Sequence, residues 1–129
     1  MLQSVRTIDN KELLRTSLIR GRFMEQLAVE IGDSNNKTAY FVTGTFSEID
    51  NILSRDMDDV LEELALHVDV KDALLGVQNL IRKMLDKVIL FETNTEWKTD
   101  ENTPETLTAD LVMEKYIAAL GWVLESGYN

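Results

Sequence analysis

The stretch AYFVTGTFSEIDNIL, residues 39–53, decides the fold, because its apolar side chains recur with a helical period. Four of them are spaced by four, three and four positions: Val42, Phe46, Ile49 and Leu53. This spacing predicts one buried helix with these side chains on its inner face. Gly44 and Thr45 lie in the middle of the segment, where small residues let another backbone approach closely. We therefore expect a neighbouring helix to pack against this point.

The segments on either side also show helical patterns. Residues 11–31 are expected to form a long amphipathic helix with this apolar stripe: Leu14, Leu18, Gly21, Met24, Ala28 and Ile31. Asp56 is expected to cap a third helix with this core face: Met57, Val60, Leu61 and Leu64. Asp69 is expected to cap a short helix that ends at Leu75, before Gly76.

Two longer helices are predicted in the second half of the chain. The first covers residues 80–95, with apolar positions Ile81, Met84, Leu85, Val88 and Phe91. The second covers residues 107–125, with apolar positions Ala109, Met113, Tyr116, Leu120 and Val123. The polar segment 98–106 holds the single proline and is predicted to be a loop. We therefore predict an all-α fold, a compact bundle of five to six helices, with residues 1–129 forming one domain.

Composition and charge exclude several classes of protein. The sequence has no cysteine, which excludes disulfides, zinc–thiolate sites and thiol nucleophiles. Its apolar runs are far shorter than the roughly 20 residues that span a bilayer, and no signal-peptide pattern begins it, so we expect a cytoplasmic protein. The net charge is −10, and residues 46–75 hold nine acidic side chains against two basic ones. Because such a surface repels phosphate and anionic lipid, we predict no nucleic-acid or membrane partner.

Residues 39–75 also carry a family likeness. The residues that match are Ala39, Tyr40, Gly44, Phe46, Ser47, Asp50, Met57, Val60, Leu61, Leu64, Ala73, Leu74 and Leu75. This pattern resembles the C-terminal part of the HDOD domain, a catalytically degenerate relative of the HD phosphohydrolases. Further matches at 12–28, 91–97 and 116–122 extend the resemblance over residues 12–122. It is strongest to the HDOD region that follows an EAL domain in bacterial cyclic di-GMP signalling proteins, although the sequence contains no EAL motif.

The resemblance also implies where catalytic residues would lie. HD phosphohydrolases hold a metal through an adjacent His-Asp pair, and the resemblance assigns those two positions to Ser47 and Glu48. Serine is a poor metal ligand, and the only histidine, His67, cannot supply the several ligands that such a centre needs. We therefore predict a chain that is not an enzyme, with no catalytic, metal-binding or cofactor-binding residues and no cofactor.

Other polar residues have structural interpretations. His67 is expected at the surface or at a helix end near the C-terminal dipole, with a stray ligand or pH switch as the alternative. The acidic cluster at Asp56, Asp58 and Asp59 lacks the glycine and glutamate of an EF-hand loop, so helix capping explains it better. Three clustered arginines are expected to form salt bridges rather than an anion site, and the last two match paired arginines of the family: Arg15, Arg20 and Arg22. We expect Arg20 and Arg22 to pair with residues 46–75.

The resemblance implies a non-catalytic signal-transduction domain that contacts another protein or an adjoining EAL-type domain. An uncovered apolar patch formed by Leu14, Leu18, Met24 and residues 2–8 is the predicted docking surface. Self-association into a homodimer through the same patch is an equal alternative. Two other classes remain open at this point. One is a helical domain that senses a small ligand, and the other is an atypical phosphohydrolase with a metal held by carboxylates.

Overall fold

The computed structural model describes residues 2–99 and 103–127, with side chains described from Asn10 onward. The described chain is all-helical, which confirms the predicted fold class. Its elements are α1 (Leu2–Glu30), the 3-10 turn η1 (Ser34–Asn36), α2 (Lys37–Phe46), α3 (Ile49–Leu53), α4 (Met57–Glu62), α5 (Val68–Leu74), α6 (Leu80–Asn94) and α7 (Ala109–Glu125). None of the helices in these two ranges combines the length and apolar character needed to cross a membrane.

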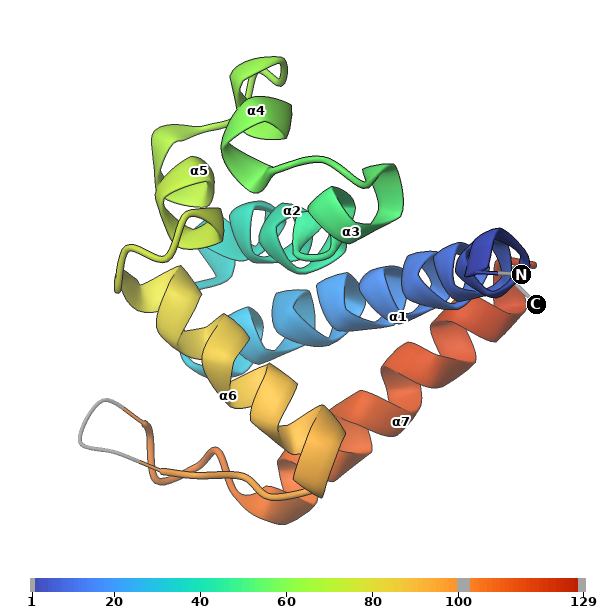
Figure 1. Cartoon of the computed structure of the whole chain (residues 1–129). Coiled ribbons are helices and arrows are strands. Elements are labelled where there is room, and N and C mark those ends of the chain that lie inside the picture. Colours follow the sequence, from blue (N-terminus) through green and yellow to red (C-terminus); the bar gives the residue numbers. More distant parts are fainter. Residues whose placement is uncertain (1, 100–102, 128–129) are drawn as a thin grey trace.

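Helix α1 is the central element of the bundle (Figure 1). It contacts α2 along one side and α7 along another, and α6 crosses near its C-terminal half. Helix α5 packs against α2 and α6, and α4 lies beside it at the edge of the molecule. Because helices surround α1 on several sides, its buried face is wider than the predicted stripe. That stripe is correct at Gly21, Met24 and Ala28, whereas Leu14 is 40% exposed.

The predicted helix over residues 39–53 is wrong in its continuity. The chain leaves helical geometry at Glu48 (φ −115°, ψ 14°), so that α2 ends at Phe46 and α3 begins at Ile49. The Ser47 hydroxyl donates to the Gly44 carbonyl at 2.7 Å, and this local bond competes with a continuing helix. The predicted inner face is correct in part. Val42 and Phe46 are half-buried and pack against a second core cluster of Leu61, Val70 and Leu74, whereas Leu53 is 48% exposed. The residues of α2 that are most buried are Tyr40, Thr43 and Gly44, which the pattern did not select.

The glycine in α2 does allow the close approach that the sequence predicts. Helix α1 crosses α2 there, and a Cβ atom built on Gly44 would lie 2.7 Å from the Cα of Gly21. A methyl group on Gly21 would in turn overlap the Thr45 hydroxyl and the Phe41 carbonyl. The two glycines therefore meet face to face, and each is required by the other helix.

The structure tests two predicted helix starts, at Asp56 and at Asp69. Asp56 occupies the predicted N-cap position of α4 in extended geometry, with Asp58 and Asp59 in the first turn, but its side chain makes no capping hydrogen bond. Helix α5 is capped by His67 and not by Asp69, because His67 Nδ1 accepts the backbone N–H of Asp69 at 3.1 Å. His67 is exposed, in agreement with the predicted surface position, but it lies at a helix N-terminus and not near a C-terminal dipole.

The two long helices of the second half are predicted with unequal success. All five expected core residues of α6 are buried. In α7 the predicted stripe is wrong at its start, since Ala109 is exposed and Met113 is 37% exposed, whereas Val112 and Ala119 are fully buried. The physical reason is that α7 has apolar residues on both faces, so periodicity alone does not select the face that α1 covers.

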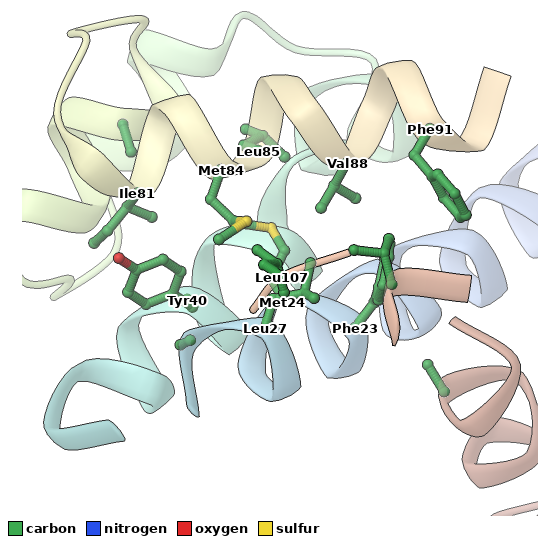
Figure 2. Close-up of a cluster of buried hydrophobic side chains, with 14 residues drawn as sticks. Phe23, Met24, Leu27, Tyr40, Ile81, Met84, Leu85, Val88, Phe91 and Leu107 are labelled. Carbon is green, nitrogen blue, oxygen red and sulfur yellow. The ribbon is translucent and has the colours of Figure 1, made fainter. Parts of the chain in front are cut away.

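The core lies between α1 and α6 (Figure 2). Phe23, Met24 and Leu27 of α1 face a row of α6 side chains that ends at Phe91, and Tyr40 of α2 closes the other end. The rings of Phe23, Phe91 and Tyr116 pack with centroids 5.3–5.7 Å apart in tilted or edge contacts. This aromatic group joins α7 to the other two helices.

Replacing Tyr40 by phenylalanine is expected to reduce the loss of stability at alkaline pH. The buried Tyr40 hydroxyl donates to Asp33 Oδ2 at 3.0 Å, and burial and this bond raise the pKa of Tyr40 above its ordinary value of 10.0. The native state therefore keeps this proton longer than the unfolded chain, so stability is full below pH ~10 and falls as the pH rises further. Urea unfolding at about pH 9 and pH 11 should show a smaller decline for Y40F than for the natural chain. Equal declines would contradict this assignment.

Candidate functional site

Arg20 of α1 is the centre of a buried ionic cluster. Its Nε donates to both carboxylate oxygens of Glu92 at 3.1 Å, and its Nη2 donates to Glu92 Oε1 at 2.6 Å. On the α2–α3 junction, Nη1 donates to Ser47 Oγ at 2.8 Å and to Glu48 Oε2 at 3.1 Å. A single side chain, only 6% exposed, therefore joins α1, α6 and the junction between α2 and α3.

The surroundings of the guanidinium keep it charged. Burial alone would lower the pKa of Arg20, but the hydrogen bonds and negative charges of Glu92 and Glu48 outweigh burial and raise this pKa. The charges of Glu92 and Arg20 also act on the pKa of Tyr116. Burial raises the pKa of its phenol, the charge of Glu92 adds to that rise, and Arg20 opposes it. The cluster thus holds one cation between two carboxylates.

The positions that the resemblance assigns to catalysis lie inside this cluster. Ser47 and Glu48 are both bound to the same nitrogen of Arg20. The other oxygen of Glu48 accepts the Asn51 side-chain amide at 2.6 Å, and the Ser47 hydroxyl donates to a backbone carbonyl. Each of these three side-chain oxygens therefore already accepts one N–H donor. A cation entering here would compete with the guanidinium of Arg20 for Glu48 and Ser47.

The expected arginine pairs are correct only in part. Arg20 does reach Glu48, which belongs to the acidic region 46–75, but its stronger partner is Glu92. Arg22 does not pair with that region. It binds Glu25 at 2.8 Å and lies over the ring of Trp122 at 5.2 Å. Arg15 pairs with Glu12, three residues earlier on the same helix.

Glu92 is the site residue that sequence reasoning missed. It lies 72 positions from Arg20 and one position after the buried Phe91, so helical periodicity places it beside the core face of α6. A signal was present, because the resemblance over residues 91–97 includes an aromatic residue followed by glutamate. The pairing itself requires the fold.

The other candidate site residues do not form a second cluster among the described side chains. His67 is exposed at the start of α5, with Asp69 Oδ2 3.8 Å from its Nδ1. Glu48 is bound to Arg20, whereas none of the interactions described for Arg20 or Glu48 includes Asp50. Among the side chains described from Asn10 onward, no three of the His, Asp and Glu groups converge in a way that would hold a metal ion.

The two tryptophans have different surroundings. Trp97 is half-buried at the start of the segment that leads to α7, and its ring meets Phe91 edge-on at 6.4 Å. This contact fixes the start of the predicted loop 98–106, of which residues 100–102 lie outside the described chain. Trp122 meets Phe41 edge-on at 6.2 Å and carries Arg22 on its face. Both tryptophans therefore have packing partners.

Two curated proteins are similar to most of this chain. It is 36% identical over 111 residues to YuxH of Bacillus subtilis (strain 168), described as an uncharacterized protein, and this match covers 86% of the chain and 27% of YuxH. It is 31% identical over 114 residues to the cyclic di-GMP phosphodiesterase CdgJ of Vibrio cholerae serotype O1, a match that covers 87% of the chain and 26% of CdgJ. The chain thus spans about a quarter of the length of each relative.

Other comparisons add no assignment. No family model matches the chain, so membership of the HDOD family stays a prediction from the residue pattern. No solved structure gives a significant match.

Proposed function

We propose that this chain is a non-catalytic, cytoplasmic signal-transduction domain of the HDOD type that takes part in bacterial cyclic di-GMP signalling. It would act by contact with a partner protein or an adjoining EAL-type domain. The signalling connection is supported by similarity to the phosphodiesterase CdgJ over 87% of the chain. The observation that carries the absence of catalysis is the binding of Ser47 and Glu48 to one buried arginine.

The electrostatics of the cluster support this proposal. A divalent ion at Glu48 would lie beside the guanidinium of Arg20, and two like charges at such distances repel in a partly buried site. Removing the arginine from Glu92 would leave a carboxylate that is only 13% exposed without its cation. Metal entry is therefore opposed by the same bonds that hold three helix segments together.

The predicted docking surface is exposed only in part. Met24 is fully buried in the core, so it cannot contact a partner, and Leu18 is half-buried. Leu14 remains exposed, and the side chains of residues 2–8 lie outside the described part. Apolar side chains that are more exposed than Leu14 occur elsewhere, on α7 at Ile117 and Leu124, and around α5 and the start of α6.

Affinity capture tests the contact function. The tagged chain, bound to beads, is exposed to native-host lysate at low and at high salt, and retained proteins are identified by mass spectrometry. We expect a protein with an EAL domain, or another protein of cyclic di-GMP turnover, to survive high salt and to change its turnover rate when the purified chain is added. Recovery of no such protein above bait-free beads at either salt would contradict the proposal.

A small-ligand sensor is the second candidate, and one observation favours it. A cleft of about 530 Å³ lies between η1, α2, α5 and the start of α6, which is within the usual range of ligand pockets. A thermal shift of several degrees with cyclic di-GMP or another nucleotide would support this function. The charged residues that line the cleft are acidic, however, and they oppose binding of an anionic nucleotide.

A further inference from the structure

The cleft beside η1 has an apolar floor and a polar wall. Its floor is built from Val42 of α2, Val70 of α5 and Ile81 of α6, and the latter two are nearly inaccessible. Its wall carries hydrogen-bonding side chains from three separate segments: Asp33, Asn35, Asn36, His67, Asp69 and Asn79. Such a combination can hold an apolar group and a polar group of the same ligand at once.

The charges of this cleft have one sign. The carboxylates of Asp33 and Asp69 line it, and no lysine or arginine is found among its described lining residues. One nearby cation is engaged by other partners, and another lies outside the cleft lining. Arg82 binds Asp86 and the Ala73 carbonyl, and Lys37 does not line the cleft. The cleft therefore has a negative potential that a cationic group would complement.

Asp33 is held in place by neutral donors alone. Its Oδ2 accepts the Tyr40 hydroxyl at 3.0 Å, and its Oδ1 accepts the Asn36 amide at 2.7 Å. These bonds fix the orientation of a half-buried carboxylate without neutralising its charge. An oriented carboxylate with lone pairs left over is a good acceptor for a guanidinium or an ammonium group.

Exposed apolar side chains lie at the rim of the cleft and in the neighbouring turn. Leu80 lines the cleft and is 61% exposed, and Val68 at the start of α5 is also 61% exposed. Leu75 and Val77, in the turn between α5 and α6, are about half exposed (49% and 52%). Of these four side chains Leu80 lines the cleft, so a partner that fills the cleft would also cover exposed apolar surface there.

We propose that this cleft binds a segment of a partner protein in which arginine or lysine alternates with leucine-like residues. The cationic group lies at Asp33 and Asp69, and the aliphatic side chains lie on Leu80 and the apolar floor. Charge complementarity selects this occupant over a second copy of the chain, because two surfaces of the same negative sign repel each other. The inference rests on the proposed contact function, and it names the surface and the chemistry of the partner.

The test is a titration of the ¹⁵N-labelled full chain with the peptide acetyl-Leu-Arg-Leu-Arg-Leu-amide at physiological salt. The matched probe replaces both arginines by citrulline, which keeps the shape and removes the charge. We expect saturable shifts at the amides of Asp33, Tyr40, Asp69 and Leu80, and binding about tenfold weaker for the citrulline peptide.

Three single substitutions test whether the peptide binds in the cleft. Asp69→Asn and Leu80→Ser change exposed side chains, and each is expected to lower the affinity for the arginine peptide about fivefold to tenfold. Asp110→Asn on α7 makes the same change of charge outside the cleft lining and should leave binding unchanged. The inference is overturned if the shifts do not saturate, if they centre on residues 46–62, or if Asp110→Asn weakens binding as much as Asp69→Asn.

The same variants separate this inference from the proposed function. Capture of the signalling partner by the natural chain, and equally by Asp69→Asn and Leu80→Ser, would overturn the cleft as the contact surface and leave the contact function standing. Loss of capture with both variants, and retention with Asp110→Asn, would support both.

Discussion

Replacing Arg20 by methionine is expected to lower the free energy of unfolding by about 3–5 kcal/mol. Methionine has a similar length but no charge, so Glu92 and Glu48 would face each other's negative charge in a site that water barely reaches. Ser47 would also lose a hydrogen-bond donor. Urea unfolding followed by circular dichroism measures the change.

Two control variants show whether the loss of stability comes from the buried ionic cluster. Arg15→Met removes an arginine from the same helix, but its pair with Glu12 is largely exposed, so its cost should stay below about 1 kcal/mol. The triple change R20M/E48Q/E92M removes the whole charged group, and most of the lost stability should return, because no unpaired charge is left buried. An R20M variant within about 1 kcal/mol of the natural chain would contradict a structural role for the cluster.

Replacing Gly44 by alanine is expected to cost about 3 kcal/mol, near the upper end for overpacked sites. The new methyl group would lie 2.7 Å from the Cα and 2.8 Å from the nitrogen of Gly21. Both atoms belong to the backbone of α1, so no side-chain rotation relieves the overlap and the two helices must separate. Thermal or urea unfolding of the variant gives the loss directly.

The matched control is Gly121→Ala in α7. Gly121 also lies in a helix, but an added Cβ there meets no atom within 4 Å. Alanine is the better helix former by about 0.5–1 kcal/mol, so this variant should be more stable than the natural chain. Opposite signs for the two glycines are expected. Destabilisation of similar size at both positions would show that the close crossing of α1 and α2 is not the cause.

Helices with a single apolar face were predicted best from the sequence. In α6 five large apolar residues share one face, and every one of them is buried. In α7 the apolar residues surround the helix, with Ile117 and Leu124 exposed on one side and Val112 and Ala119 buried on the other. Periodicity cannot choose between two apolar faces, because that choice depends on which neighbour packs there.

The break after α2 and the ionic cluster required the tertiary structure. Glu48 leaves the helix where its carboxylate binds Arg20, a residue 28 positions away in the sequence. Glu92, 72 positions away, shows no local pattern that selects its partner. The acidic cleft is similar, since η1, α5 and α6 supply its walls from separate parts of the chain.

Turnover of cyclic di-GMP tests the central claim most directly, namely that Ser47 and Glu48 belong to a structural cluster and not to a catalytic centre. The purified chain is incubated with cyclic di-GMP and either Mg²⁺ or Mn²⁺, and linear products are separated by chromatography. We expect no product above the protein-free control with either ion. Metal-dependent product that disappears in Glu48→Gln would contradict the claim and identify the chain as a hydrolase.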